Sequence, residues 1–122
     1  MTSDEFRGIA LSFPDAVESS HMGHPDFRVL GKIFATLSYP DESWGMVKLP
    51  PEEQYSFVHA HPEVFAPANG AWGRQGSTKV RLDGVDANTL RHTLGIAWRS
   101  VAVKQSKKRP NREGTRRSTN GK

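Results

Sequence analysis

Two runs of alternating apolar and polar residues, separated by a single glycine, most constrain how this chain can fold. Residues 27–30 and 32–38 have the length and composition of β-strands, and Gly31 between them is typical of a tight hairpin turn. In the second run, strict alternation would place Phe34 and Ala35 on opposite faces of a sheet. The segment therefore predicts an antiparallel hairpin with one buried face.

The flanking patterns predict helices on both sides of this hairpin. Residues 2–13 have apolar side chains at helical spacing behind a capping box of Thr2 and Glu5. A second helix is expected to begin at Pro50–Pro51, and Asp86 would cap a long last helix. Further strands are expected at residues 18–22, 44–49 and 77–82, with a short one in the Pro- and Gly-rich stretch 62–76.

The resulting element order is α-β(3-4)-α-β(1-2)-α. Because consecutive strands are joined by short turns, the strands should form one antiparallel sheet. The helices would then cover one face of that sheet and leave the other at least partly open. The sequence predicts an α+β fold, a two-layer sandwich.

The net charge of +4 is unevenly distributed along the chain. Residues 104–122 contain eight basic residues and one acid, a net charge of +7, whereas residues 1–103 contain nine basic residues and twelve acids, a net charge of −3. No hydrophobic pattern remains after about residue 104, which is typical of a disordered tail. We therefore expect a folded domain at residues 1–103 and a basic, disordered tail at residues 104–122.

The composition excludes several classes of protein. The chain contains no cysteine, so disulfides, thiolate metal ligands and cysteine nucleophiles are absent. It has neither a signal-peptide pattern at its N-terminus nor an apolar run of membrane-spanning length. We expect a cytoplasmic protein without a membrane partner.

His21 and His24 are the residues most suggestive of a metal site. Their spacing of three would bring both side chains to one site only in a helix, and Gly23 and Pro25 make a helix unfavourable there. The simpler interpretation is that residues 23–25 turn the chain. No nucleophile elbow, phosphate-binding loop or dinucleotide fingerprint is present. We expect no enzyme activity, no metal and no cofactor.

Basic residues near one strand are the best candidates for a binding surface in the folded part. Lys79 and Arg81 would project from the open face of the sheet, with Arg74 in the adjoining loop and Trp72 able to stack on a base. Ordinary solvation of an outward strand face is the alternative interpretation. The tail would add non-specific phosphate contacts, and its candidate residues are Lys107, Lys108, Arg109, Arg112, Arg116 and Arg117.

The chain also contains a set of segments that together resemble a known family. These are ALSFPDAVESSHMGHPDFRVLGKIFATL, VKLPPEEQ, HPEVFAPANGAWGRQGSTKVRL and AWRSVAVK. In combination, over about residues 6–104, they resemble the bacterial MmcQ/YjbR family. The matching positions are His21, Gly23, Pro25, Phe27, Gly31, Lys32, Trp72, Gly73 and Trp98.

The resemblance implies a two-layer α/β fold similar to those of secretion chaperones and frataxin, and a DNA-binding function. It supplies no catalytic residues, and it does not extend to the basic tail. The leading hypothesis is therefore a small cytoplasmic protein that binds DNA largely non-specifically. The alternative is a protein-interaction module with a chaperone-like fold, which would hold a protein segment on its open sheet face or in an apolar groove.

Overall fold

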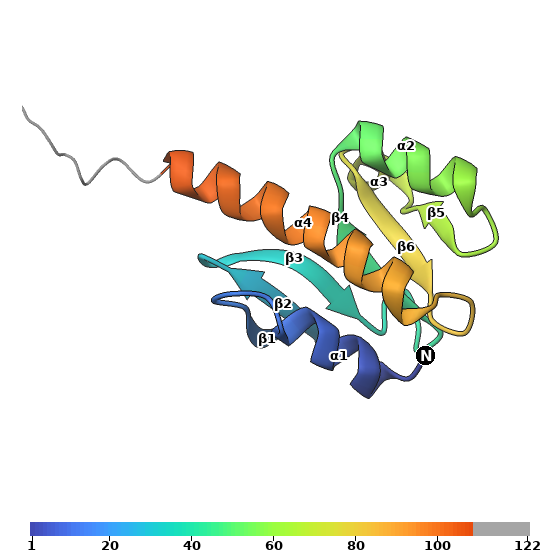
Figure 1. Cartoon of the computed structure of the whole chain (residues 1–122), viewed down its shortest axis with the longest axis horizontal. Coiled ribbons are helices and arrows are strands. Elements are labelled where there is room, and N and C mark those ends of the chain that lie inside the picture. The colour runs from blue at the N-terminus through green and yellow to red at the C-terminus, as the bar shows by residue number, and fades with distance from the viewer. Residues whose placement is uncertain (109–122) are drawn as a thin grey trace, which may run out of the picture.

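The computed structural model describes residues 1–108 and contains a six-stranded sheet with helices packed on it (Figure 1). All neighbouring strands are antiparallel, in the order β1-β2-β3-β4-β6-β5. The strands are β1 Val17–His21, β2 His24–Val29, β3 Lys32–Leu37, β4 Trp44–Lys48, β5 Phe65–Pro67 and β6 Ser77–Arg81. The helices are α1 Ser3–Leu11, α2 Pro51–Ala60, α3 Gly70–Arg74 and α4 Ala87–Lys108. The predicted α+β class and antiparallel sheet are confirmed.

The N-terminal ends of two helices are capped as the sequence predicts. The Thr2 hydroxyl accepts a hydrogen bond from the Glu5 N–H (3.0 Å), and the Glu5 carboxylate accepts one from the Thr2 N–H (2.8 Å). The Asp86 carboxylate accepts a hydrogen bond from the Thr89 N–H (2.7 Å) at the start of α4. These bonds satisfy donors that have no partner within the helix.

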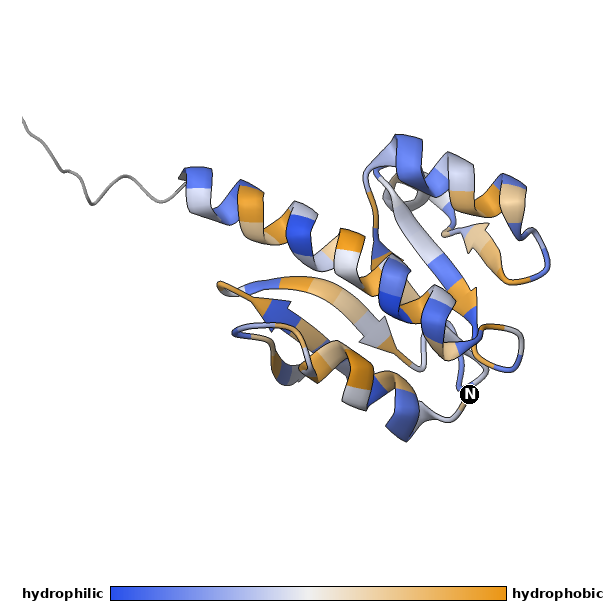
Figure 2. Ribbon diagram, viewed as in Figure 1, coloured by the Kyte–Doolittle hydropathy of each residue, from blue (hydrophilic) through white to orange (hydrophobic). Residues whose placement is uncertain are grey.

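One hydrophobic core fills the space between the sheet and the helices α1 and α4. Phe6 of α1 is fully buried and contacts Phe27 of β2, with ring centroids 6.0 Å apart. The place of Phe6 depends on Gly45, because a Cβ there would lie 2.8 Å from the Phe6 ring. Figure 2 shows predominantly hydrophobic residues along β3, which lies between α1 and α4 in this view.

The prediction of strict alternation along β3 is wrong. The pairing register of β2 with β3 shifts between Phe27 and Arg28, so an extra residue is inserted in β3. Such a bulge places two consecutive side chains on the same side of a strand. Phe34 and Ala35 are accordingly both buried on the helix side, at 0% and 1% exposure. Thr36 then lies on the opposite face of the sheet, where it pairs with Met46 of β4.

Two boundaries and one element also differ from the predictions. His24 and Pro25 belong to β2, paired with His21 and Ser20, so the chain turns at residues 22–23. The Pro- and Gly-rich stretch contains the short helix α3 in addition to β5. The last helix continues to Lys108, past the predicted start of the tail at residue 104, because the sequence there retains good helix formers such as Lys and Gln. The remainder of the predicted tail, residues 109–122, lies outside the described residues.

No helix within residues 1–108 combines the length and the hydropathy needed to span a bilayer.

Candidate binding face of the sheet

The side of the sheet opposite α1 and α4 carries a set of polar, basic and aromatic side chains that we call the open face. Four residues lie directly opposite one another on neighbouring strands of this face. Thr36 of β3 pairs with Asp26 of β2 and with Met46 of β4, and Met46 pairs with Lys79 of β6. A second pair joins Trp44 to Arg81. The open face comprises His21, His24, Asp26, Arg28, Thr36, Trp44, Met46, Lys48, Ser77, Lys79 and Arg81.

Lys79 and Arg81 lie over the same indole ring on this face. The Lys79 Nζ is 4.9 Å and the Arg81 guanidinium carbon 4.4 Å from the centroid of the Trp44 ring. Each contact contributes about 0.5–1 kcal/mol at such a partly exposed site. The ring thus holds two positive charges side by side, and within residues 1–108 neither forms an ion pair with a carboxylate.

A buried carboxylate organises the other end of the open face. Asp26 is fully buried and accepts hydrogen bonds from the Arg28 Nε (2.8 Å) and a terminal Arg28 nitrogen (3.1 Å). The His21 Nδ1 lies 2.8 Å from the second carboxylate oxygen. The hydrogen bonds from Arg28 and then from His21 lower the pKa of Asp26, against the opposing effect of burial. The ionised carboxylate therefore fixes the positions of both side chains.

Aromatic rings from separate parts of the chain meet beside His24, which pairs with His21 on this face. The Tyr39 ring lies 5.2 Å from that of His24 and 6.3 Å from that of Trp72, measured between centroids. Trp72 nevertheless keeps 58% of its surface exposed. An exposed indole is unusual for a side chain of this size and marks a candidate contact surface.

A groove of about 860 Å³ is lined by Tyr39 and Trp72 and extends to the end of α4, which packs on the other side of the sheet. Among residues 1–108, three lysines and no carboxylate line it: Lys32 and Lys48 come from β3 and β4, and Lys104 from α4. Its remaining walls are His21, Met22, Ile33, Ala35, Thr36, Tyr39, Met46, Leu49, Pro50, Pro51, Trp72, Gln75, Ser77, Ser100, Val101 and Gln105. Its volume lies within the range of ligand-binding pockets.

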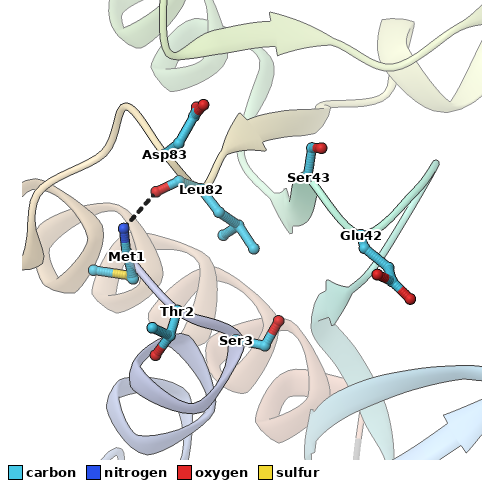
Figure 3. Close-up of a pocket in the computed structure, with 7 residues that line it drawn as sticks. All are labelled: Met1, Thr2, Ser3, Glu42, Ser43, Leu82 and Asp83. Atoms are coloured by element: carbon cyan, nitrogen blue, oxygen red, sulfur yellow. Dashed lines mark hydrogen bonds between the residues drawn. The ribbon is translucent and has the colours of Figure 1, made fainter.

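A second, smaller pocket of about 290 Å³ lies where the chain start meets the end of β6 (Figure 3). The Met1 ammonium group donates a hydrogen bond to the Leu82 carbonyl (2.9 Å) across it. Glu42 and Asp83 are the acidic side chains among its lining residues. This pocket therefore has the opposite charge character from the groove.

The predicted site residues are only partly brought together. Lys79 and Arg81 share the Trp44 ring, whereas Arg74 is exposed at the end of α3, which precedes the opposite end of β6. Lys107 is exposed in the last turn of α4, and Lys108 ends that helix. The other four predicted tail residues lie outside the described part of the chain: Arg109, Arg112, Arg116 and Arg117.

His21 and His24 lie on the two strands of one hairpin, with ring centroids 6.3 Å apart. Within residues 1–108, no three His, Asp or Glu side chains gather as metal ligands. The partner of His21 is Asp26, and the two side chains form an ion pair when the imidazole is protonated.

The candidate site also includes Asp26, Trp44 and Tyr39, which were not predicted from the sequence. Asp26 precedes Phe27, which is buried on the helix side, and successive side chains of a strand point to opposite faces. The position of Asp26 on the open face could therefore have been predicted from the sequence. Trp44 also lies at an open-face position, but its role depends on a pairing with β6 that is distant in sequence. The position of Tyr39 depends on how the chain turns after β3, for which the sequence carries no clear signal.

Comparisons with known proteins give a family and a fold. The family model described as YjbR matches residues 11–100. Among solved structures, the crystal structure of Deinococcus radiodurans protein DR2400, which carries a DUF419 domain, is similar with a TM-score of 0.74 and 23% sequence identity. The similarity covers 96% of this chain and 96% of that one. No curated protein sequence matches this chain significantly.

Proposed function

This chain belongs to the YjbR family, and we propose that it is a cytoplasmic, non-enzymatic protein that binds nucleic acid through the open face of its sheet. The observation that carries this proposal is the paired placement of Lys79 and Arg81 on the Trp44 ring. Two unneutralised cations next to an aromatic ring are suited to phosphates and bases together. The basic residues from 104 onward would add affinity that does not depend on sequence.

The distribution of charge over the folded part supports the choice of face. Among the described residues, the open face carries Arg28, Lys48, Lys79 and Arg81 against the one carboxylate Asp26, although residues 1–103 have a net charge of −3. The acidic residues therefore lie mainly on other surfaces. A polyanion would be attracted to the open face and repelled from most of the rest.

The decisive experiment measures binding by fluorescence anisotropy with the full chain and a labelled DNA duplex, over a series of salt concentrations. The double variant Lys79→Ala/Arg81→Ala is compared with Arg91→Ala/Arg99→Ala, which removes two exposed cations from α4. We expect the first variant to bind more weakly. A plot of the logarithm of its association constant against the logarithm of salt concentration should be less steep by about 1.8, because each lost phosphate contact reduces the steepness by about 0.9. The control variant should retain the wild-type slope.

Equal slopes for the two double variants would refute the role of the open face. Removal of residues 109–122 tests the tail separately, and we expect it to weaken binding and reduce the salt dependence further. Unchanged binding by the shortened chain would exclude a contribution from those residues.

The apolar part of the groove favours a second candidate function, a protein-interaction module. Met46, Leu49 and Pro50 line the groove beside the exposed Trp72, and apolar anchors of this kind also bind peptides. Capture of partners from lysate with and without nuclease separates the two functions. Partners that remain bound after nuclease treatment would favour the protein-interaction module.

A further inference from the structure

The groove beside Trp72 suggests which form of nucleic acid the open face binds. We propose that it accommodates unpaired nucleobases, so that the protein binds single strands in preference to duplexes. This inference rests on the proposed function and adds the class of ligand. It is drawn from the position and exposure of Trp72, the charges around the groove and its continuity with the basic pair.

Trp72 is positioned as a stacking platform. Its ring makes an angle of 54° with that of Tyr39, so the two rings are not stacked on each other. With 58% of Trp72 exposed, its indole retains free aromatic surface at the groove. Bases in a duplex are already stacked on their neighbours, whereas an unpaired base can place its face on such a ring.

The charge of the groove complements a phosphodiester backbone. Lys32, Lys48 and Lys104 line it from three different elements, and its lining within the described residues contains no carboxylate. Gln75 and Ser77 add groups that can donate and accept hydrogen bonds at the edge of a base. An aromatic ring, polar groups and surrounding lysines together match a nucleotide better than they match an apolar peptide.

The groove also continues into the basic pair on β6. Met46 lines the groove and pairs directly with Lys79, and the next open-face pair is Trp44 with Arg81. Lys79 and Arg81 are two residues apart, which separates them by roughly 6.6 Å along the strand. A single strand leaving the groove along β6 would therefore meet positive charges at regular intervals.

The test uses the full chain, a labelled oligothymidine strand and a labelled duplex of the same length, with affinities measured by anisotropy. Trp72→Ala is compared with Tyr55→Ala, which removes an exposed aromatic side chain of α2 that does not line the groove. We expect wild type to favour the single strand. Loss of one stacked base should weaken single-strand binding by about fivefold to a hundredfold and change duplex binding less than twofold. Tyr55→Ala should match wild type for both ligands.

Trp72→Phe guards against a folding artefact, because it keeps an aromatic face and should retain most of the single-strand affinity. The inference is overturned if Trp72→Ala binds the single strand as tightly as wild type, or if it weakens both ligands equally. In either case the proposed function stands as long as the duplex responds to Lys79→Ala/Arg81→Ala. If wild type binds neither ligand, both the inference and the proposed function fail.

Discussion

Replacement of Asp26 by Asn tests how the carboxylate network organises the open face. Asp26 is completely buried and accepts two hydrogen bonds from the Arg28 guanidinium and one from the His21 ring. Asn has nearly the same shape but no charge, and its NH₂ group cannot accept a hydrogen bond from either partner. A hydrogen bond to a charged group contributes about 1.5–3 kcal/mol, and breaking a buried ion pair costs about 3–5 kcal/mol.

Arg28 is 31% exposed and can recover part of its hydration, which reduces the loss. We therefore expect Asp26→Asn to lower the free energy of unfolding by about 2–3 kcal/mol at pH 7. Urea denaturation followed by circular dichroism measures this difference directly.

The same variant should show a characteristic pH dependence. Because the hydrogen bonds from Arg28 lower the pKa of Asp26, folding favours the ionised carboxylate over its state in the unfolded chain. The stabilisation is fully present above the ordinary carboxyl pKa of 3.8 and is lost as the pH falls through the lower pKa of the folded state. The gap between wild type and Asp26→Asn should therefore narrow as the pH falls below about 4.

Two results would refute this reasoning about Asp26. One is a variant as stable as wild type at pH 7, which would mean that the hydrogen bonds contribute nothing net. The other is a stability gap that stays constant or widens as the pH falls below about 4, which would mean that the carboxylate is not stabilised in its ionised form.

Three further substitutions test local parts of the fold, each by thermal or urea unfolding. Gly76→Ala should be severely destabilising, by more than about 3 kcal/mol, because φ is +111° and the new Cβ would lie 1.8 Å from the Leu49 carbonyl oxygen; a mild effect would show that the connection can shift. Thr2→Ala should cost about 0.5–2 kcal/mol through loss of the α1 cap, and an unchanged stability would contradict that role. Trp98→Phe removes the N–H that donates to the Pro14 carbonyl at 2.9 Å and should cost about 0.5–1.5 kcal/mol, whereas a stabilised variant would show that the bond is unimportant.

The element order could be predicted because each element is marked by neighbouring residues. The start of α1 is marked by the capping box at Thr2, and the turn between β2 and β3 is marked by Gly31. Both signals lie within a few residues of the element that they mark. The disordered tail is predicted to begin at residue 104, whereas α4 continues to Lys108, because a basic, polar sequence is compatible both with a helix surface and with a tail. The bulge in β3 was missed because it arises from packing and has no clear local signal.

The candidate site was less predictable, because it is made by contacts between distant segments. Lys79 and Arg81 could be identified from the alternation of one strand, but the ring beneath them belongs to β4. The groove joins residues of β3, β4, α3 and α4, and no property of these segments taken singly indicates that they meet. Arg74 illustrates the converse, since its closeness in sequence to β6 did not place it with Lys79 and Arg81.

The two proposed binding elements should respond differently to salt. Contacts between lysine or arginine side chains and phosphates weaken steeply as salt rises, because they depend on counterion release. Stacking on Trp72 involves no net charge and is screened far less. As salt increases, the contribution of the basic residues from 104 onward to the binding affinity should fall first. The contribution of the base stacked on Trp72 should change little. The preference for single strands over duplexes should therefore grow as the salt concentration rises, even though the affinity for both ligands falls. If the basic residues alone bound nucleic acid, the duplex would be preferred at every salt concentration because its charge density is higher.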